Sequence, residues 1–186
     1  TDVEVESEHM KAMDVTAEIS GREQYMEALS EEGQAIREHQ AAEFRDEKNH
    51  WTIRIHNGEG DATVARETTM RQASDAESRT HFVRSFDTAM EWDWDDHIRA
   101  FDEDGDLRVE KVTDRPNNKR FDIHFPVGAD LSERYTYTYE YDWDALFPQD
   151  EEVYVVTGNA EYVEFELHYP DEMEVANLYC EEVEQS

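Results

Sequence analysis

The chain has 186 residues, a usual length for one domain, and its 48 acidic and 17 basic side chains give a formal net charge of −31. This charge argues against direct contact with nucleic acid, because phosphates are bound by clusters of lysine and arginine. The sequence has no apolar run of membrane-spanning length and a single cysteine, Cys180, and its opening residues are not expected to be a signal peptide. We therefore expect a soluble protein with no intramolecular disulfide.

The acidic charge extends along the whole chain, and three explanations compete for it. Lysine is scarce and arginine is retained, which resembles the surfaces of proteins from halophilic archaea and their viruses, where salt cations screen the repulsion. Disorder is the second explanation, but the strand patterns below argue against it for most of the chain. The third is an acidic surface for a basic partner, or a mimic of DNA. Residues 135–186 are its best candidate, with 15 acids and no lysine or arginine. Adaptation to salt is the explanation that we adopt.

The first 49 residues divide into an arm and a helical segment. Residues 1–19 are mostly polar, and the alternation of Val3 and Val5 with acids indicates a short added strand. Residues 20–49 begin with a capping box and are predicted to form an amphipathic helix. Its apolar stripe, a docking face for the same domain or for a neighbouring subunit, is predicted to consist of Tyr25, Leu29, Ile36 and Phe44.

From Trp51 onward the sequence indicates short strands separated by turns. Asn57-Gly58 is a turn signal between the apolar alternation at 51–55 and its hairpin partner at 62–70. Asp104-Gly105 is predicted to join a second hairpin. Further strands are expected at 81–86, 98–101, 107–110, 120–125, 135–143, 153–156, 162–169 and 175–179.

The clearest strand is 135–143, where tyrosines alternate with Thr136, Thr138 and Glu140. It is predicted to bury a row of tyrosine rings on one face, as in an antiparallel sheet that is packed on one side and wet on the other. The fold class is therefore mainly β: an antiparallel β-sandwich, jelly-roll or immunoglobulin-like, of about eight to nine strands after an N-terminal helix. The sandwich is expected to span residues 50–180, with an acidic tail at 181–186.

The search for chemistry yields binding candidates rather than a catalytic motif. Trp92 and Trp94, set between acids, are candidate partner-binding residues, although such rings are more often buried. His124 and His168 could share a metal with Glu166 or Asp122 if their strands were neighbours, but two surface histidines are the simpler interpretation. The loop 102–106 lacks the glycine and glutamate spacing of a calcium site, and its sequence fits a hairpin turn.

These features favour a non-catalytic structural or assembly protein that binds other copies or other subunits and needs no cofactor. Its most concrete form is a jelly-roll shell subunit, such as a virion capsid protein of a halophile, by fold-level analogy. The alternative is a ligand- or partner-binding immunoglobulin-like domain in the cytoplasm of a halophilic archaeon. An enzyme with an unrecognised site is the third class.

Overall fold

The computed structural model describes residues 2–7, 42–73, 75–84, 90–116, 118–146 and 160–171, with backbone only for 2–7. Every element within these residues is a strand, which confirms the mainly β class. The strands are β1 (Asp2–Ser7), β2 (Phe44–Ile55), β3 (Ala62–Gln72), β4 (Ser78–Arg84), β5 (Ile98–Phe101), β6 (Asp106–Arg115), β7 (Asn118–His124), β8 (Tyr135–Trp143) and β9 (Tyr162–His168).

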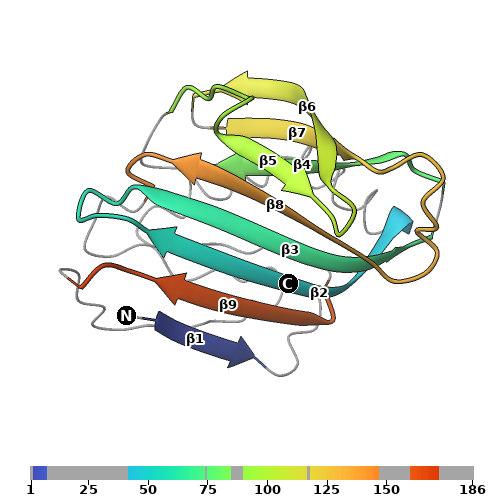
Figure 1. The fold of residues 1–186 in the computed structure, drawn as a ribbon, viewed down its shortest axis with the longest axis horizontal. Coiled ribbons are helices and arrows are strands. Elements are labelled where there is room, and N and C mark those ends of the chain that lie inside the picture. Colours follow the sequence, from blue (N-terminus) through green and yellow to red (C-terminus); the bar gives the residue numbers. More distant parts are fainter. Residues whose placement is uncertain are drawn as a thin grey trace, which may run out of the picture.

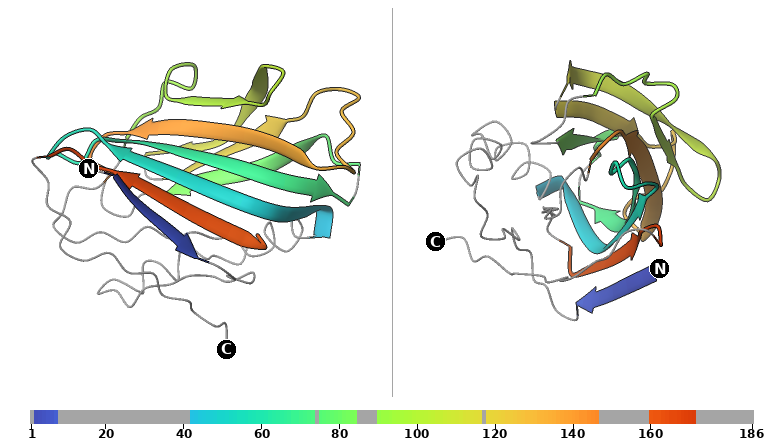
Figure 2. Two further views of the ribbon diagram at one scale, coloured as in Figure 1. Left: turned by 60° about the horizontal axis from the view of Figure 1, so that its bottom comes forward. Right: turned by 90° about the vertical axis from the view of Figure 1, so that its left-hand side faces the viewer.

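All nine strands belong to one sheet, in the order β1-β9-β2-β3-β8-β5-β6-β7-β4 (Figure 1). The sheet curls into a half-barrel, with β1 and β4 at its two margins (Figure 2). β6 connects the two parts of the curled sheet. Its first residues, Asp106 and Leu107, pair with β5, whereas the residues from Arg108 onward pair with β7. A bulge between Lys111 and Thr113 interrupts the second part, and Val112 within it is exposed.

The hydrophobic core lies on the concave face of this sheet, and β8 runs through its middle. Tyr137, Tyr139, Tyr141 and Trp143 are each at most 2% exposed, whereas Asp142 on the opposite face is exposed. The tyrosine rings pack against one another and against Phe121 and Phe125 from β7 and the turn after it. The predicted burial of the tyrosine row is confirmed.

The structure does not confirm a sandwich. The strands form one continuous curled sheet instead of two facing sheets, so the core is enclosed by curvature. The sheet is also mixed, because β9 runs parallel to β2 from Lys48↔Tyr162 to Arg54↔His168. The strands predicted at 120–125, 135–143 and 162–169 correspond to β7, β8 and β9, and these are not neighbours in the sheet.

The predicted helix at 20–49 is wrong at its C-terminal end. Phe44 to Asn49 belong to β2, which begins seven residues before the expected strand start at Trp51. The cause is a bulge between Asp46 and Lys48, which breaks the alternation that would have marked these residues as a strand. Residues 20–41 lie outside the described part of the chain, as do the strands predicted at 153–156 and 175–179 and the tail at 181–186.

Both predicted hairpins are present. β2 and β3 are antiparallel from Phe44↔Gln72 to Ile55↔Ala62, and the turn between them contains Asn57-Gly58. In the β5–β6 hairpin, Asp102 Oδ1 accepts hydrogen bonds from the backbone N–H of Asp104 and Gly105. Gly105 has a φ of 147°, which favours glycine there. No helix in the described residues is long and apolar enough to cross a membrane.

Candidate functional site: a buried cationic network

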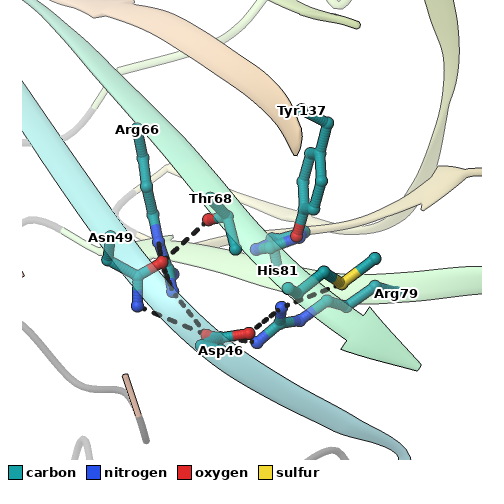
Figure 3. A network of polar contacts seen from close by, with 8 residues as sticks. Asp46, Asn49, Arg66, Thr68, Arg79, His81 and Tyr137 are labelled. Atoms are coloured by element: carbon teal, nitrogen blue, oxygen red, sulfur yellow. Dashed lines mark hydrogen bonds and ion pairs between the residues drawn. The ribbon is translucent and has the colours of Figure 1, made fainter. Parts of the chain in front are cut away.

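The most distinctive chemistry in the described residues is a polar network inside the concave face (Figure 3). Its members come from strands that are far apart in sequence, and each is at most 8% exposed. They are Asp46 and Asn49 of β2, Arg66 and Thr68 of β3, Arg79 and His81 of β4, and Tyr137 of β8. Buried charges require partners, so their contacts show what the site can do.

The bulge in β2 explains how Asp46 and Asn49 reach the same face. In a regular strand, residues three apart point to opposite faces. Here Asp46 is opposite Met70 and Asn49 is opposite Thr68, and these two β3 residues share a face. The extra residue in β2 therefore turns both polar side chains into the core, where Asn49 Nδ2 donates to Asp46 Oδ2 at 3.3 Å.

Asp46 forms a two-pronged ion pair with Arg79 across the interior. Arg79 Nη1 lies 2.6 Å from Asp46 Oδ1, and Nη2 lies 2.9 Å from Oδ2. Burial opposes ionisation of Asp46, but Arg79 together with Arg66 and Asn49 keeps the pKa of this carboxyl below its usual value. β4 is the edge strand on one side of the sheet, and β2 lies near the opposite edge. The Asp46–Arg79 ion pair therefore links the two sides of the curled sheet.

Arg66 is the second buried cation of the network. Its Nε and Nη2 donate to Asn49 Oδ1 at 3.2 and 3.0 Å, and its guanidinium lies 5.0 Å from the centre of the Trp51 ring. Its Nη2 is 3.5 Å from Asp46 Oδ2, a longer contact than those made by Arg79. Arg66 is thus held mainly by a neutral amide and an aromatic face.

His81 connects the cations to the tyrosine row. Its Nε2 lies 3.0 Å from the hydroxyl oxygen of Tyr137, and its ring is 4.7 Å from that of Tyr139. Burial, reinforced by Arg79 and Arg66, lowers the pKa of His81 well below its ordinary value of 6.5. Burial also raises the pKa of Tyr137. At neutral pH both rings are therefore uncharged.

Positive charge exceeds negative charge in this interior. Asp46 is the only buried acid among the described residues and faces two buried cations of the network, Arg66 and Arg79, whereas the buried Lys119 lies apart from them and pairs with Asp114. Arg79 Nε is buried and donates no hydrogen bond within the described residues. In a protein of net charge −31, the concave face is thus the region with an electrostatic preference for an anion. At neutral pH Asp46 stays charged and His81 stays neutral, so the network sets two guanidinium groups against a single carboxylate.

Trp92 and Trp94, the predicted partner-binding tryptophans, form a second cluster around Lys119. Trp92 is 6% exposed and packs on Trp143, whereas Trp94 is half-buried and its indole donates to Asp114 at 2.8 Å. Lys119, 1% exposed, lies over the Trp92 ring and pairs with Asp114 at 2.7 Å. The Trp92 ring is therefore part of the core, and Trp94 covers it.

The other predicted site residues divide into two groups. Phe44 is 3% exposed in β2, where its ring packs on Phe125 and lies under Arg79, so it belongs to the core instead of a helical docking face. Tyr25, Leu29 and Ile36 lie outside the described residues.

His124 and His168 are not brought together. They lie on β7 and β9, which are separated by five strands in the sheet order. Each contacts a glutamate instead: His124 lies 3.1 Å from Glu110, and His168 lies 2.7 Å from Glu166. In the described part of the chain, no group of histidine, cysteine and acidic side chains has the geometry to hold a metal ion.

The buried network was missed by sequence reasoning. Asp46 fell within the predicted helix, and Arg66 and Arg79 looked like ordinary polar residues of a strand and a loop end. The sequence did contain one clue. Every second residue of a strand points to the same face, and Arg66 lies two residues from Val64 and four from Met70 on β3, so it shares their buried face.

Comparison with protein-family models and with curated proteins finds no family and no protein that matches this chain.

Proposed function

We propose that the chain is a non-catalytic structural protein that assembles through the sheet margin formed by β9 and β1. The observation that supports this is the covering of β9 by residues 2–7, which come from the opposite end of the sequence and not from an adjoining hairpin. An edge strand presents unpaired backbone groups that bind another extended segment. A margin completed by a distant arm is a common means of joining subunits.

The surface charge is compatible with assembly in concentrated salt. At −31 per chain, neighbouring copies repel in dilute buffer, whereas at about 1 M salt the Debye length shrinks to roughly 3 Å. A shell subunit, such as that of a virion formed in molar salt, is the most concrete version of this proposal. It rests on the composition and on the β-rich architecture.

The test is the mass of the protein in about 3 M KCl, measured by light scattering over a range of concentrations. We expect species larger than the 21.9 kDa chain. Leu167→Lys, which puts a charge on the half-buried face of β9, should shift the protein toward monomer while the β circular dichroism signal persists. Val127→Lys, at a fully exposed position, is the matched control and should leave the mass unchanged. A wild-type monomer at every concentration would overturn the proposal.

The excess of buried cations favours a second candidate, a binding domain for a small carboxylate on the concave face. Calorimetric titration with acetate and with citrate, at constant ionic strength, tests it directly. Binding that is lost in Arg66→Gln would support this function, since Arg66 lies 3.5 Å from Asp46 whereas Arg79 lies 2.6 Å from it, and Arg66 is therefore the cation less neutralised by this acid. The absence of heat with both anions would exclude it.

A further inference from the structure

Among the strands that the structure describes, the arm strand β1 pairs with one neighbour. It stands at the end of the sheet order and pairs with β9 over six residue positions, from Asp2↔His168 to Ser7↔Val163. Figure 1 shows β1 beyond β9 at the margin of the sheet. Its backbone pairing is the same whether the β9 strand belongs to its own chain or to another copy.

The chain between β1 and β2 is long enough for both arrangements. Residues 8–43 separate Ser7 from Phe44, which makes 36 residues. Fully extended, they could span about 120 Å. The whole folded chain of 186 residues has an expected radius of gyration of about 16 Å. Chain length therefore does not restrict residues 2–7 to the β9 strand of the same copy.

The register predicts that β1 binds β9 weakly in dilute buffer. Val3 and Val5 are the register partners of Leu167 and Phe165, which pack against the core. Between them, however, Glu4 is opposite Glu166. Glu6 is likewise opposite Glu164. Like charges at directly opposed positions of antiparallel strands destabilise their pairing.

The β9 glutamates have partners that only partly offset this repulsion. Lys48 forms an ion pair with Glu164, and this contact lowers the pKa of Glu164. Glu166 lies between His168 at 2.7 Å and His50 at 3.5 Å, and neither imidazole is a permanent cation. Salt screens exposed charges, so pairing of β1 with β9 should strengthen as the salt concentration rises.

From these observations we propose that β1 is an exchangeable strand, which pairs with β9 of a second copy of this chain in concentrated salt. This inference rests on the proposed assembly function and specifies the partner and the contact. Within one chain, the tether holds β1 near β9 at an effective concentration of the order of millimolar. Exchange between copies therefore becomes favourable when copies are crowded together, as in a growing assembly, and each exchanged pair links two subunits.

Cross-linking by disulfide tests the exchange directly. Two variants, Glu4→Cys and Glu166→Cys, each also carrying Cys180→Ser, are mixed in dilute salt, transferred to about 3 M KCl and oxidised. Glu4 and Glu166 are register partners, and opposed positions of neighbouring strands are close enough for a disulfide. We expect a disulfide-linked dimer of twice the 21.9 kDa chain mass on a non-reducing gel.

Two controls make the result decisive. Glu4→Cys mixed with Arg108→Cys measures random collision, because Arg108 is an exposed residue of β6 far from β9 in the sheet order, and we expect no dimer from this pair. A single chain carrying both Glu4→Cys and Glu166→Cys reports pairing within one copy. If this chain closes internally while the mixture yields no more dimer than the Arg108 control, exchange is refuted. If neither forms a cross-link, β1 does not pair with β9 and the inference also fails.

The two proposals fail in different ways. Large species in concentrated salt without a Glu4–Glu166 cross-link between copies would leave the assembly function standing and remove strand exchange. A monomer at every concentration would remove the assembly function itself.

Discussion

At the scale of single residues, Asp46 is the described residue whose charge depends most on its partners, because it is a buried acid. It is 1% exposed and balances Arg79 and, at longer range, Arg66. Breaking a buried ion pair from one side costs more than the pair contributes, because the remaining charge loses its counterion without regaining water. The Asp46–Arg79 pair joins β2 to β4, so loss of Asp46 would leave an unpaired charge between the two sides of the curled sheet.

The change Asp46→Asn tests this position. It removes the only buried acid of the described residues and leaves two guanidinium groups in the interior, so unfolding free energy should fall by about 3–5 kcal/mol. Urea unfolding in concentrated KCl measures the loss. The matched control is Glu161→Gln, whose partner Arg45 is largely exposed, and it should cost at most about 1 kcal/mol. Similar losses in both variants would contradict the role given to Asp46.

His81 should confer a pH dependence of stability with a defined sign. Its pKa in the folded protein lies well below the ordinary 6.5, so below about pH 6.5 the unfolded chain takes up a proton that the folded chain does not. Stability should therefore decrease as the pH falls from about 6.5 toward the folded pKa.

In His81→Gln this decrease should be smaller, because glutamine has no proton to gain. Melting temperatures between about pH 7.5 and 5, at constant high salt, measure the difference. His56→Gln removes a histidine from an exposed position and should keep the wild-type slope. Parallel pH curves for wild type and His81→Gln would show that the position of His81 has been misjudged.

At the scale of elements, β8 is the strand on which the core depends. It lies between β3 and β5 and supplies four of the most deeply buried aromatic side chains. Large side chains of this kind contribute through the apolar area that they remove from water and through the contacts made by their rings. β9, near the margin, has only one deeply buried side chain, Val163.

This difference predicts unequal effects of truncation in the two strands. Tyr139→Ala, at 1% exposure and in contact with His81 and Phe121, should cost about 3–5 kcal/mol. Phe165→Ala, at a half-buried position stacked on Trp51, should cost at least about 1 kcal/mol less, because solvent already reaches that side chain. Chemical unfolding of the two variants gives the comparison, and equal losses would mean that β9 is as central as β8.

At the scale of the whole molecule, the formal net charge of −31 should determine the conditions under which the protein is stable. Most of the ion pairs in the described residues are at least partly exposed, so they are screened together with the repulsion and offset little of it. The net effect of salt should be dominated by relief of the like-charge repulsion.

Thermal unfolding between about 0.1 and 3 M KCl checks this expectation. The melting temperature should rise, and most steeply at the lower salt concentrations, where the Debye length falls from about 10 Å toward 3 Å. Sucrose at matched water activity, which does not screen charge, is the control and should produce a smaller rise. A melting temperature independent of KCl would contradict adaptation to salt.

The sequence by itself determined the class of the fold and most of its strands. Alternation has a period of two that a single strand expresses without help from its neighbours, so the buried tyrosines of β8 and the turns at Asn57-Gly58 and Asp104-Gly105 were predicted correctly. The simpler interpretation of Trp92, a buried ring, was likewise available from residue type.

Only the tertiary structure decided the order of the strands, the curl of the sheet and the buried network. Each depends on contacts between residues distant in sequence, such as Asp46 with Arg79, and local periodicity carries no information about them. The bulge at Asp46–Lys48 removed the alternation from the start of β2, and without it Asp46 and Asn49 would not share the concave face. The charges of Asp46, Arg66 and Arg79 looked like surface charges in the sequence, because burial follows from which strands meet and not from residue type.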